Sequence, residues 1–219
     1  MDEDLLLTTE YLTEQEQIEL LKQWVKQYSL VILLGLLLSL VTIYGWRYWQ
    51  ARQQRIMNHA SMVYDEMLTA RAQNNVTATQ TQSSKLFTHY TSTAYAQLAA
   101  FMLARDAVNQ KNYTEAEKQL NWVIDHSSTA SFRQIARLRL ARVLINENKT
   151  ADALKILSSV EDKSFNGLTD EVRGDAWLAQ KDTTKAREAY QLALKELPNA
   201  EVIRPLLQMK FDNLAPGAA

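Results

Sequence analysis

The feature that most constrains this chain is a run of 20 uncharged residues, 27–46, between Lys26 and Arg47. An α-helix rises 1.5 Å per residue, so the run would extend about 30 Å, the thickness of a bilayer's hydrocarbon core. Residues 30–43 include eleven Leu, Ile or Val residues, which together favour membrane insertion by about 3–7 kcal/mol. The run therefore predicts a transmembrane helix over 28–49.

Aromatic residues stand at both ends of this run, where amphipathic rings meet lipid headgroups. They are Trp24, Tyr28, Tyr44, Trp46, Tyr48 and Trp49. A buried core helix and a cleaved signal peptide are the alternatives. The 29-residue leader carries seven Asp or Glu residues against Lys22 and Lys26, and no A-x-A cleavage site follows the run. We therefore expect an uncleaved anchor that has the lipid bilayer as its partner.

The charges beside the run do not decide the orientation of the anchor. Lys22 and Lys26 precede the run, whereas Arg47, Arg52 and Arg55 follow it. Counted alone, these residues slightly favour keeping the C-terminal part on the cytoplasmic side.

Two local patterns belong to the same region. Gly35 and Ser39 form a small-xxx-small pair, a candidate contact for another membrane helix. Upstream, the letters TEQE at 13–16 are typical of a capping box, so we expect a short helix over 13–27 within an N-terminal segment 1–27.

The part of the chain after the anchor repeats itself. LARDAVN at 103–109 recurs 37 residues later as LARVLIN at 140–146, and a third unit follows 33 residues further on. Each unit has one small residue in its first helix and another near the start of its second. These are Ala104, Ala141 and Gly174, then Ala116, Ala153 and Ala186. Small residues at these positions let two helices cross closely, which is typical of tetratricopeptide repeats.

The composition agrees with an all-α fold, because five glycines and three prolines are too few for a hairpin-rich β protein. We expect a helical connection and a degenerate first repeat over 50–93, with a polar linker at 74–84. Three tetratricopeptide-like repeats follow over 94–200, and a capping helix and tail over 201–219.

Residues that carry chemistry are sparse. The chain has no cysteine, and its three histidines, His59, His89 and His126, have no metal-ligand spacing. A net charge of −1 gives no field that would attract nucleic acid. No glycine-rich phosphate loop is present. We therefore expect a non-enzymatic protein without a metal, a cofactor, a nucleic-acid partner or a small-molecule substrate.

Several strings together resemble the YfgM family, the ancillary subunit of the bacterial SecYEG translocon. The strings are YLTEQEQ at 11–17, GWRYW at 45–49, YAQLAA at 95–100, QLNWV at 119–123, ARLRLARVL at 136–144, RGD at 173–175 and AREAY at 186–190. They are spread over nearly the whole chain. A generic tetratricopeptide array would not reproduce both the flanks of the anchor and these repeat-specific strings.

The resemblance implies an inner-membrane protein with a cytoplasmic N-terminus and a periplasmic repeat domain. It implies association with SecYEG and with the periplasmic chaperone PpiD, and assistance to client proteins that emerge from the translocon. One alternative is a structural scaffold for envelope biogenesis or cell-division machinery. Another, if the orientation is reversed, is a regulator that faces the cytosol.

Tetratricopeptide arrays bind ligands in a concave groove lined by the first helix of each unit. In this register the candidate groove residues are Phe101, Arg105, Asn109, Leu138, Arg142, Ile145 and Asn146. Guanidinium groups and amides there can hold a peptide backbone or carboxylates, while the apolar side chains hold apolar ones. The alternative is that the arginines pair with carboxylates on neighbouring helices and that the apolar residues are core.

Overall fold

The computed structural model describes residues 14–159, 161–197 and 201–214, and its regular structure within these ranges is helical throughout. The helices are α1 (Glu14–Ala72), α2 (Val76–His89), α3 (Ala94–Asn109), α4 (Tyr113–His126), α5 (Ala130–Asn146), α6 (Thr150–Leu157), the 3-10 turn η1 (Lys163–Phe165), α7 (Asn166–Ala179), α8 (Thr183–Glu196) and α9 (Arg204–Asp212). The predicted all-α fold is confirmed. The chain divides into two compact units, residues 1–55 and 56–219, which are described separately.

The first unit contains the apolar part of α1. Among the described residues, α1 is the one helix long and apolar enough to cross a membrane: its best window has a mean hydropathy of 2.1 and none of it is buried. The Ser39 hydroxyl donates to the Gly35 carbonyl at 2.8 Å, and a Cβ on Gly35 would meet no atom within 4 Å. The Gly35/Ser39 face is therefore open, and its contact with another membrane helix stays a prediction.

The helix expected over 13–27 leads directly into the apolar run, because α1 runs without a break from Glu14 to Ala72. Residues 14–72 contain no proline to remove a backbone donor, and the segment after the apolar run is rich in Gln and Arg, which favour helix. The predicted capping box at 13–16 depends on side chains outside the described residues.

The polar linker predicted over 74–84 is wrong, since α2 covers Val76–His89. Asn75 caps this helix by accepting a hydrogen bond from the Ala78 backbone N–H at 3.0 Å. Leu86 buries its side chain completely against the end of α1 and the start of α3. Tertiary burial and one cap thus outweigh the low helix propensity of the Thr and Ser residues.

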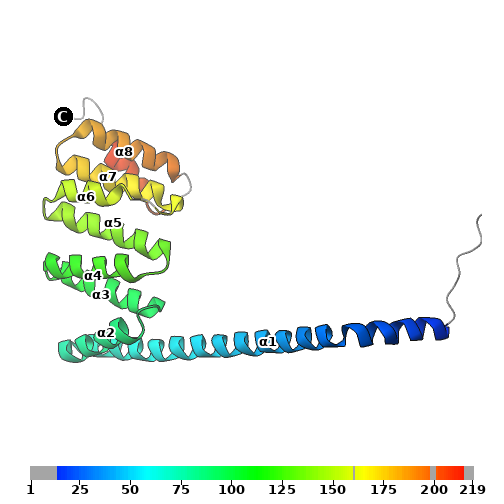
Figure 1. The fold of residues 1–219 in the computed structure, drawn as a ribbon. Helices are drawn as coiled ribbons and strands as arrows, with labels where there is room; N and C mark the ends of the chain where they lie inside the picture. Colours follow the sequence, from blue (N-terminus) through cyan, green and yellow to red (C-terminus); the bar gives the residue numbers. More distant parts are fainter. Residues whose placement is uncertain (1–13, 160, 198–200, 215–219) are drawn as a thin grey trace, which may run out of the picture. The chain divides into compact units, whose positions relative to one another are not determined.

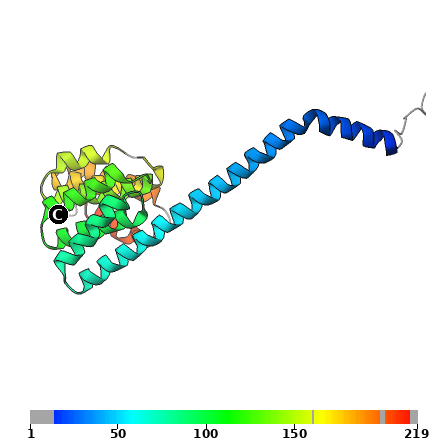
Figure 2. The ribbon, with the colours of Figure 1, turned by 60° about the horizontal axis from the view of Figure 1, so that its bottom comes forward.

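The second unit is a stack of helix pairs: the end of α1 with α2, then α3 with α4, α5 with α6, and α7 with α8 (Figure 1). Figure 2 shows the same stack turned by 60°, again with consecutive pairs side by side. The small residues predicted for the crossings of the last three pairs are all buried. Ala116, Ala141, Ala153 and Ala186 have no exposed surface, and Ala104 is 3% exposed.

One turn geometry joins the helices of all four pairs. Each turn has a non-glycine residue with φ between 55° and 64°. These residues are Asn74, Lys111, Asn148 and Lys181, spaced by 37, 37 and 33 residues. The next residue caps the second helix in three pairs, where Asn75, Asn112 and Asp182 accept a backbone N–H. The first pair therefore shares the turn of the other three, although its sequence lacks their small-residue pattern.

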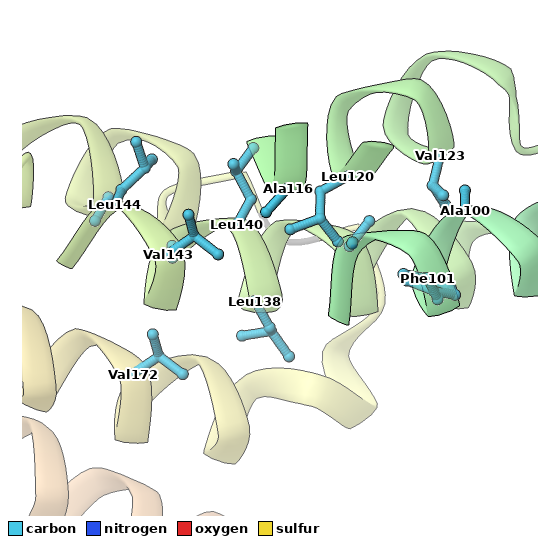
Figure 3. Close-up of a cluster of buried hydrophobic side chains, with 14 of the residues drawn as sticks. Ala100, Phe101, Ala116, Leu120, Val123, Leu138, Leu140, Val143, Leu144 and Val172 are labelled. Atoms are coloured by element: carbon cyan, nitrogen blue, oxygen red, sulfur yellow. The ribbon is translucent and has the colours of Figure 1, made fainter. Parts of the chain in front are cut away.

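Large apolar side chains fill the space between pairs (Figure 3). Leu120 of α4 and Leu140 of α5 are 1% and 2% exposed. Leu138 of α5 points towards α7, which contributes the fully buried Val172 to the same cluster. The stack therefore has a continuous core from α3 to α7.

Helix α9 closes the last pair only in part. Leu207 is fully buried, with Phe211 beside it, in a cluster with the apolar face of α8. Val202 precedes α9, and Leu206 and Met209 lie in it; these three apolar residues are 91%, 50% and 53% exposed. A helix of only nine residues turns a single narrow face to the core, so the other apolar residues stay outside.

The α7/α8 crossing yields a stability prediction. A Cβ on Gly174 would overlap with the fully buried Tyr190 ring, whose hydroxyl donates to Asp175 Oδ1 at 2.7 Å. Gly174→Ala must therefore shift the ring and that hydrogen bond, which we expect to cost about 1–3 kcal/mol of unfolding free energy. Denaturant unfolding of the detergent-solubilised chain measures the loss.

The control for this experiment is Gly45→Ala, because a Cβ at Gly45 meets nothing within 4 Å. It should leave unfolding of the repeat domain unchanged. Equal stability of the two variants would contradict the tight crossing.

Candidate binding surfaces

The predicted groove residues lie on two neighbouring first helices. Phe101, Arg105 and Asn109 belong to α3, and Leu138, Arg142, Ile145 and Asn146 belong to α5. Phe101 and Leu138 are buried core residues, 7% and 4% exposed, and Ile145 is half-buried. The polar members Arg105, Asn109, Arg142 and Asn146 are exposed. For the two buried residues the structure favours the core alternative.

Arg142 has a carboxylate partner. Its Nη2 lies 3.1 Å from Glu171 Oε2 on α7, and the Glu171 side chain is only 8% exposed. Lys210 of α9 donates to Glu171 Oε1 at 2.9 Å and to Asp175 Oδ1 at 2.8 Å. Arg142 thus belongs to an ionic network that joins α5, α7 and α9, and it contributes to the structure.

The network keeps its members in defined charge states. Burial alone would lower the pKa of Lys210, but hydrogen bonds to Asp175 and Glu171 outweigh it and raise the pKa. Burial, together with the hydrogen bond to Asp175, raises the pKa of Tyr190 far above its usual value. At neutral pH Lys210 is therefore charged and the Tyr190 hydroxyl is a neutral donor.

Arg105 and Arg139 differ from Arg142, because no described contact joins either of them to a carboxylate. The Arg139 guanidinium lies over the Phe101 ring, 4.5 Å from its centroid, a cation–π geometry. Desolvation and the neighbouring positive charge of Arg142 lower the pKa of Arg139. Phe132 extends the aromatic surface, with its ring centroid 6.1 Å from that of Phe101. We call Phe101, Arg105, Phe132 and Arg139 the arginine–aromatic face.

Sequence reasoning missed Arg139 and Phe132. The available signal was the i, i+3 spacing of Arg139 and Arg142 within the helical run ARLRLAR, which places the two arginines on one side of α5. The recurrence at 37 residues selected Arg142 instead, because it matches Arg105 in position.

A separate cavity of about 1040 Å³ lies between α2 and α4, over the C-terminal half of α3. Asn109 lines it together with Phe87, Leu103 and Trp122. The corresponding space between α4 and α6 holds only about 540 Å³. The cavity is therefore a local property of the first two pairs.

Comparison with known proteins now identifies the family. The tetratricopeptide repeat-like domain family matches residues 22–216. The chain belongs to this family. Two relatives are named as ancillary SecYEG translocon subunits, one from Haemophilus influenzae and one from Escherichia coli K12. The first is 27% identical over 92% of this chain and 97% of its own length, and the second is 26% identical over 94% and 98%. The predicted resemblance to the YfgM family is thereby confirmed. No solved structure matches the chain.

The arginines yield a second stability prediction. Arg142→Glu removes one of the two cationic partners of the buried Glu171 carboxylate and places a like charge beside it, so we expect a loss of about 1–3 kcal/mol of unfolding free energy. Arg105→Glu breaks no described contact and should stay within about 0.5 kcal/mol of the unaltered chain. Denaturant unfolding of both variants measures the difference. Equal effects would show that the Arg142–Glu171 pair is not formed.

Proposed function

We propose that this chain is a non-catalytic, single-pass inner-membrane adaptor of the SecYEG translocon that assists proteins emerging into the periplasm. The observation that carries the proposal is the near full-length match to two ancillary translocon subunits. An apolar N-terminal helix and a stack of protein-binding helix pairs fit this role. The resemblance also makes the chaperone PpiD a proposed partner.

The proposed orientation has a cytoplasmic N-terminus and a periplasmic repeat domain. The charges next to the apolar run oppose it slightly, but long C-terminal domains translocate largely regardless of flanking charge. The repeat unit, residues 56–219, is long in this sense.

The arginine–aromatic face is the proposed contact for a partner or client. Arg105 and Arg139 have no described carboxylate partner, and a guanidinium group binds a carboxylate with two parallel hydrogen bonds. Phe132, which is half-buried, offers ring surface beside Phe101, and the Arg139 guanidinium covers the buried Phe101 ring. An acidic or carboxylate-bearing segment of a protein fits this combination. Arg142 of α5 supports the face, because its ion pair with Glu171 of α7 fixes its position.

Co-purification tests the proposed function. We expect SecYEG and PpiD to co-purify with the full chain from detergent-solubilised membranes. The combined substitution Arg105→Glu and Arg139→Glu should lower recovery of PpiD or of crosslinked client at least fivefold, because two cations become anions. Quantitative immunoblotting measures the recovery.

The matched control is Lys181→Glu with Lys195→Glu, which changes the net charge equally but lies outside α3 and α5. It should leave recovery unchanged. Recovery of cell-wall enzymes in place of SecYEG would support an envelope scaffold and refute the proposal.

A fusion tests the orientation. Alkaline phosphatase joined to the C-terminus folds only in the periplasm, where its disulfides form, so we expect an active fusion. The matched fusion to green fluorescent protein should be dark after export through the translocon. An inactive phosphatase fusion together with a fluorescent green fluorescent protein fusion would place the repeat domain in the cytosol.

A further inference from the structure

The cavity between α2 and α4 exists because α2 presents small side chains there. Thr79, Ser83 and Ser84 line it, and Ser83 stands at the position that Leu120 takes in α4 and Leu157 in α6. Ser83 is buried and donates to the Gln80 carbonyl within its own helix. Hydroxyl-bearing side chains of this size do not reach α4. At about 1040 Å³, the space is at the upper end of the range for ligand pockets.

The charged residues that line the cavity neutralise one another. Arg71 donates to both carboxylate oxygens of Asp106, at 2.5 and 2.6 Å. Glu115 lies 3.5 Å from Lys118 and also accepts a hydrogen bond from Gln119 at 2.6 Å. Two cations and two anions therefore leave no net charge for an ionic ligand.

The polar groups left over are amides. No described hydrogen bond engages the side-chain amides of Asn74, Gln80, Asn109 and Gln110, and all four residues are exposed. Each amide offers two donor hydrogens and one acceptor oxygen, as complementary partners for peptide N–H and C=O groups. Asn74 lies in the turn between α1 and α2, Gln80 in α2 and Asn109 at the end of α3, so these amides come from three parts of the cavity lining.

The base of the cavity is apolar. The Phe87 and Trp122 rings have centroids 4.5 Å apart, and Leu103 and Ala107 of α3 lie beside them. Phe87 and Trp122 are half-buried, so part of each ring faces the cavity. Such a base can accept one large apolar side chain.

We propose that this cavity binds an extended, uncharged polypeptide segment, with free amides on its backbone and an apolar side chain over Phe87 and Trp122. The proposal rests on the proposed chaperone function and names one class of client segment. It differs from the arginine–aromatic face in its charge requirement. Binding in the cavity is insensitive to salt, whereas binding to unpaired arginines weakens as salt screens the charges.

The experiment uses the full chain in lipid nanodiscs and a capped octapeptide of Gly, Ser and Asn with a central Phe, labelled with the uncharged dye dansyl. Fluorescence anisotropy measures its affinity. Ser84→Trp fills the cavity from an exposed position and should weaken binding at least tenfold. Thr88→Trp, one turn further along α2 and outside the cavity, should stay within twofold. Raising NaCl from 50 to 500 mM should also change the affinity less than twofold.

A second measurement tests the site without relying on the Ser84→Trp variant, which could lose binding by misfolding. A benzophenone side chain at Gln110 should crosslink the peptide, and one at Thr88 should not. Three results would overturn the inference. The first is a failure of the unaltered chain to bind the peptide. The second is equal binding by the two tryptophan variants together with equal crosslinking at the two benzophenone sites. The third is a tenfold loss of affinity when NaCl is raised from 50 to 500 mM. If SecYEG still co-purifies in that case, the proposed function stands and only the cavity assignment fails.

Discussion

The close crossing of two helices at a small residue is the contact on which the rest of this stack depends. Ala104, Ala141 and Gly174 remove side-chain bulk from the first helix of each pair, so the second helix approaches closely. The space saved at the crossing lets residues such as Leu120 and Leu140 meet between pairs and form one core. Since both faces of the pair are then used for burial, the outward stripe of each first helix stays exposed. The positions of Arg105 and Arg142 follow from this geometry.

The first pair has the same turn as the other three pairs but lacks a large apolar side chain between its second helix and the next pair. Asn74 has the same left-handed backbone as Lys111, so α2 leaves α1 by the same turn that α4 uses to leave α3. With Ser83 in place of a leucine such as Leu120 or Leu157, α2 and α4 do not close on each other, and a cavity remains. Backbone geometry and side-chain volume thus vary independently along the array.

Features with a strong local pattern could be predicted from the sequence. The membrane helix could be predicted from the length and hydropathy of the apolar run alone. The last three helix pairs could be predicted from small residues that recur at intervals of 37 and 33 residues. Helix α2 was missed because its Thr and Ser residues have low helix propensity and its stability comes from Asn75 and Leu86. The Arg142–Glu171 pair joins residues 29 positions apart on different helices, and no spacing rule within one helix reaches that far. The exposure of Leu206 and Met209 likewise depends on how short α9 is.

The ionic network around Glu171 explains why no described carboxylate pairs with Arg139. Glu171 neutralises Arg142, which lies one turn from Arg139 on α5, but Lys210 also shares that carboxylate. The Glu171 carboxylate is therefore already paired with two cations. The Arg139 guanidinium lies over the Phe101 ring instead. A guanidinium on an aromatic ring keeps its N–H groups at the ring plane's edge available to a ligand. A carboxylate that bound there would relieve the repulsion between Arg139 and Arg142, which agrees with the carboxylate-bearing partner proposed for this face.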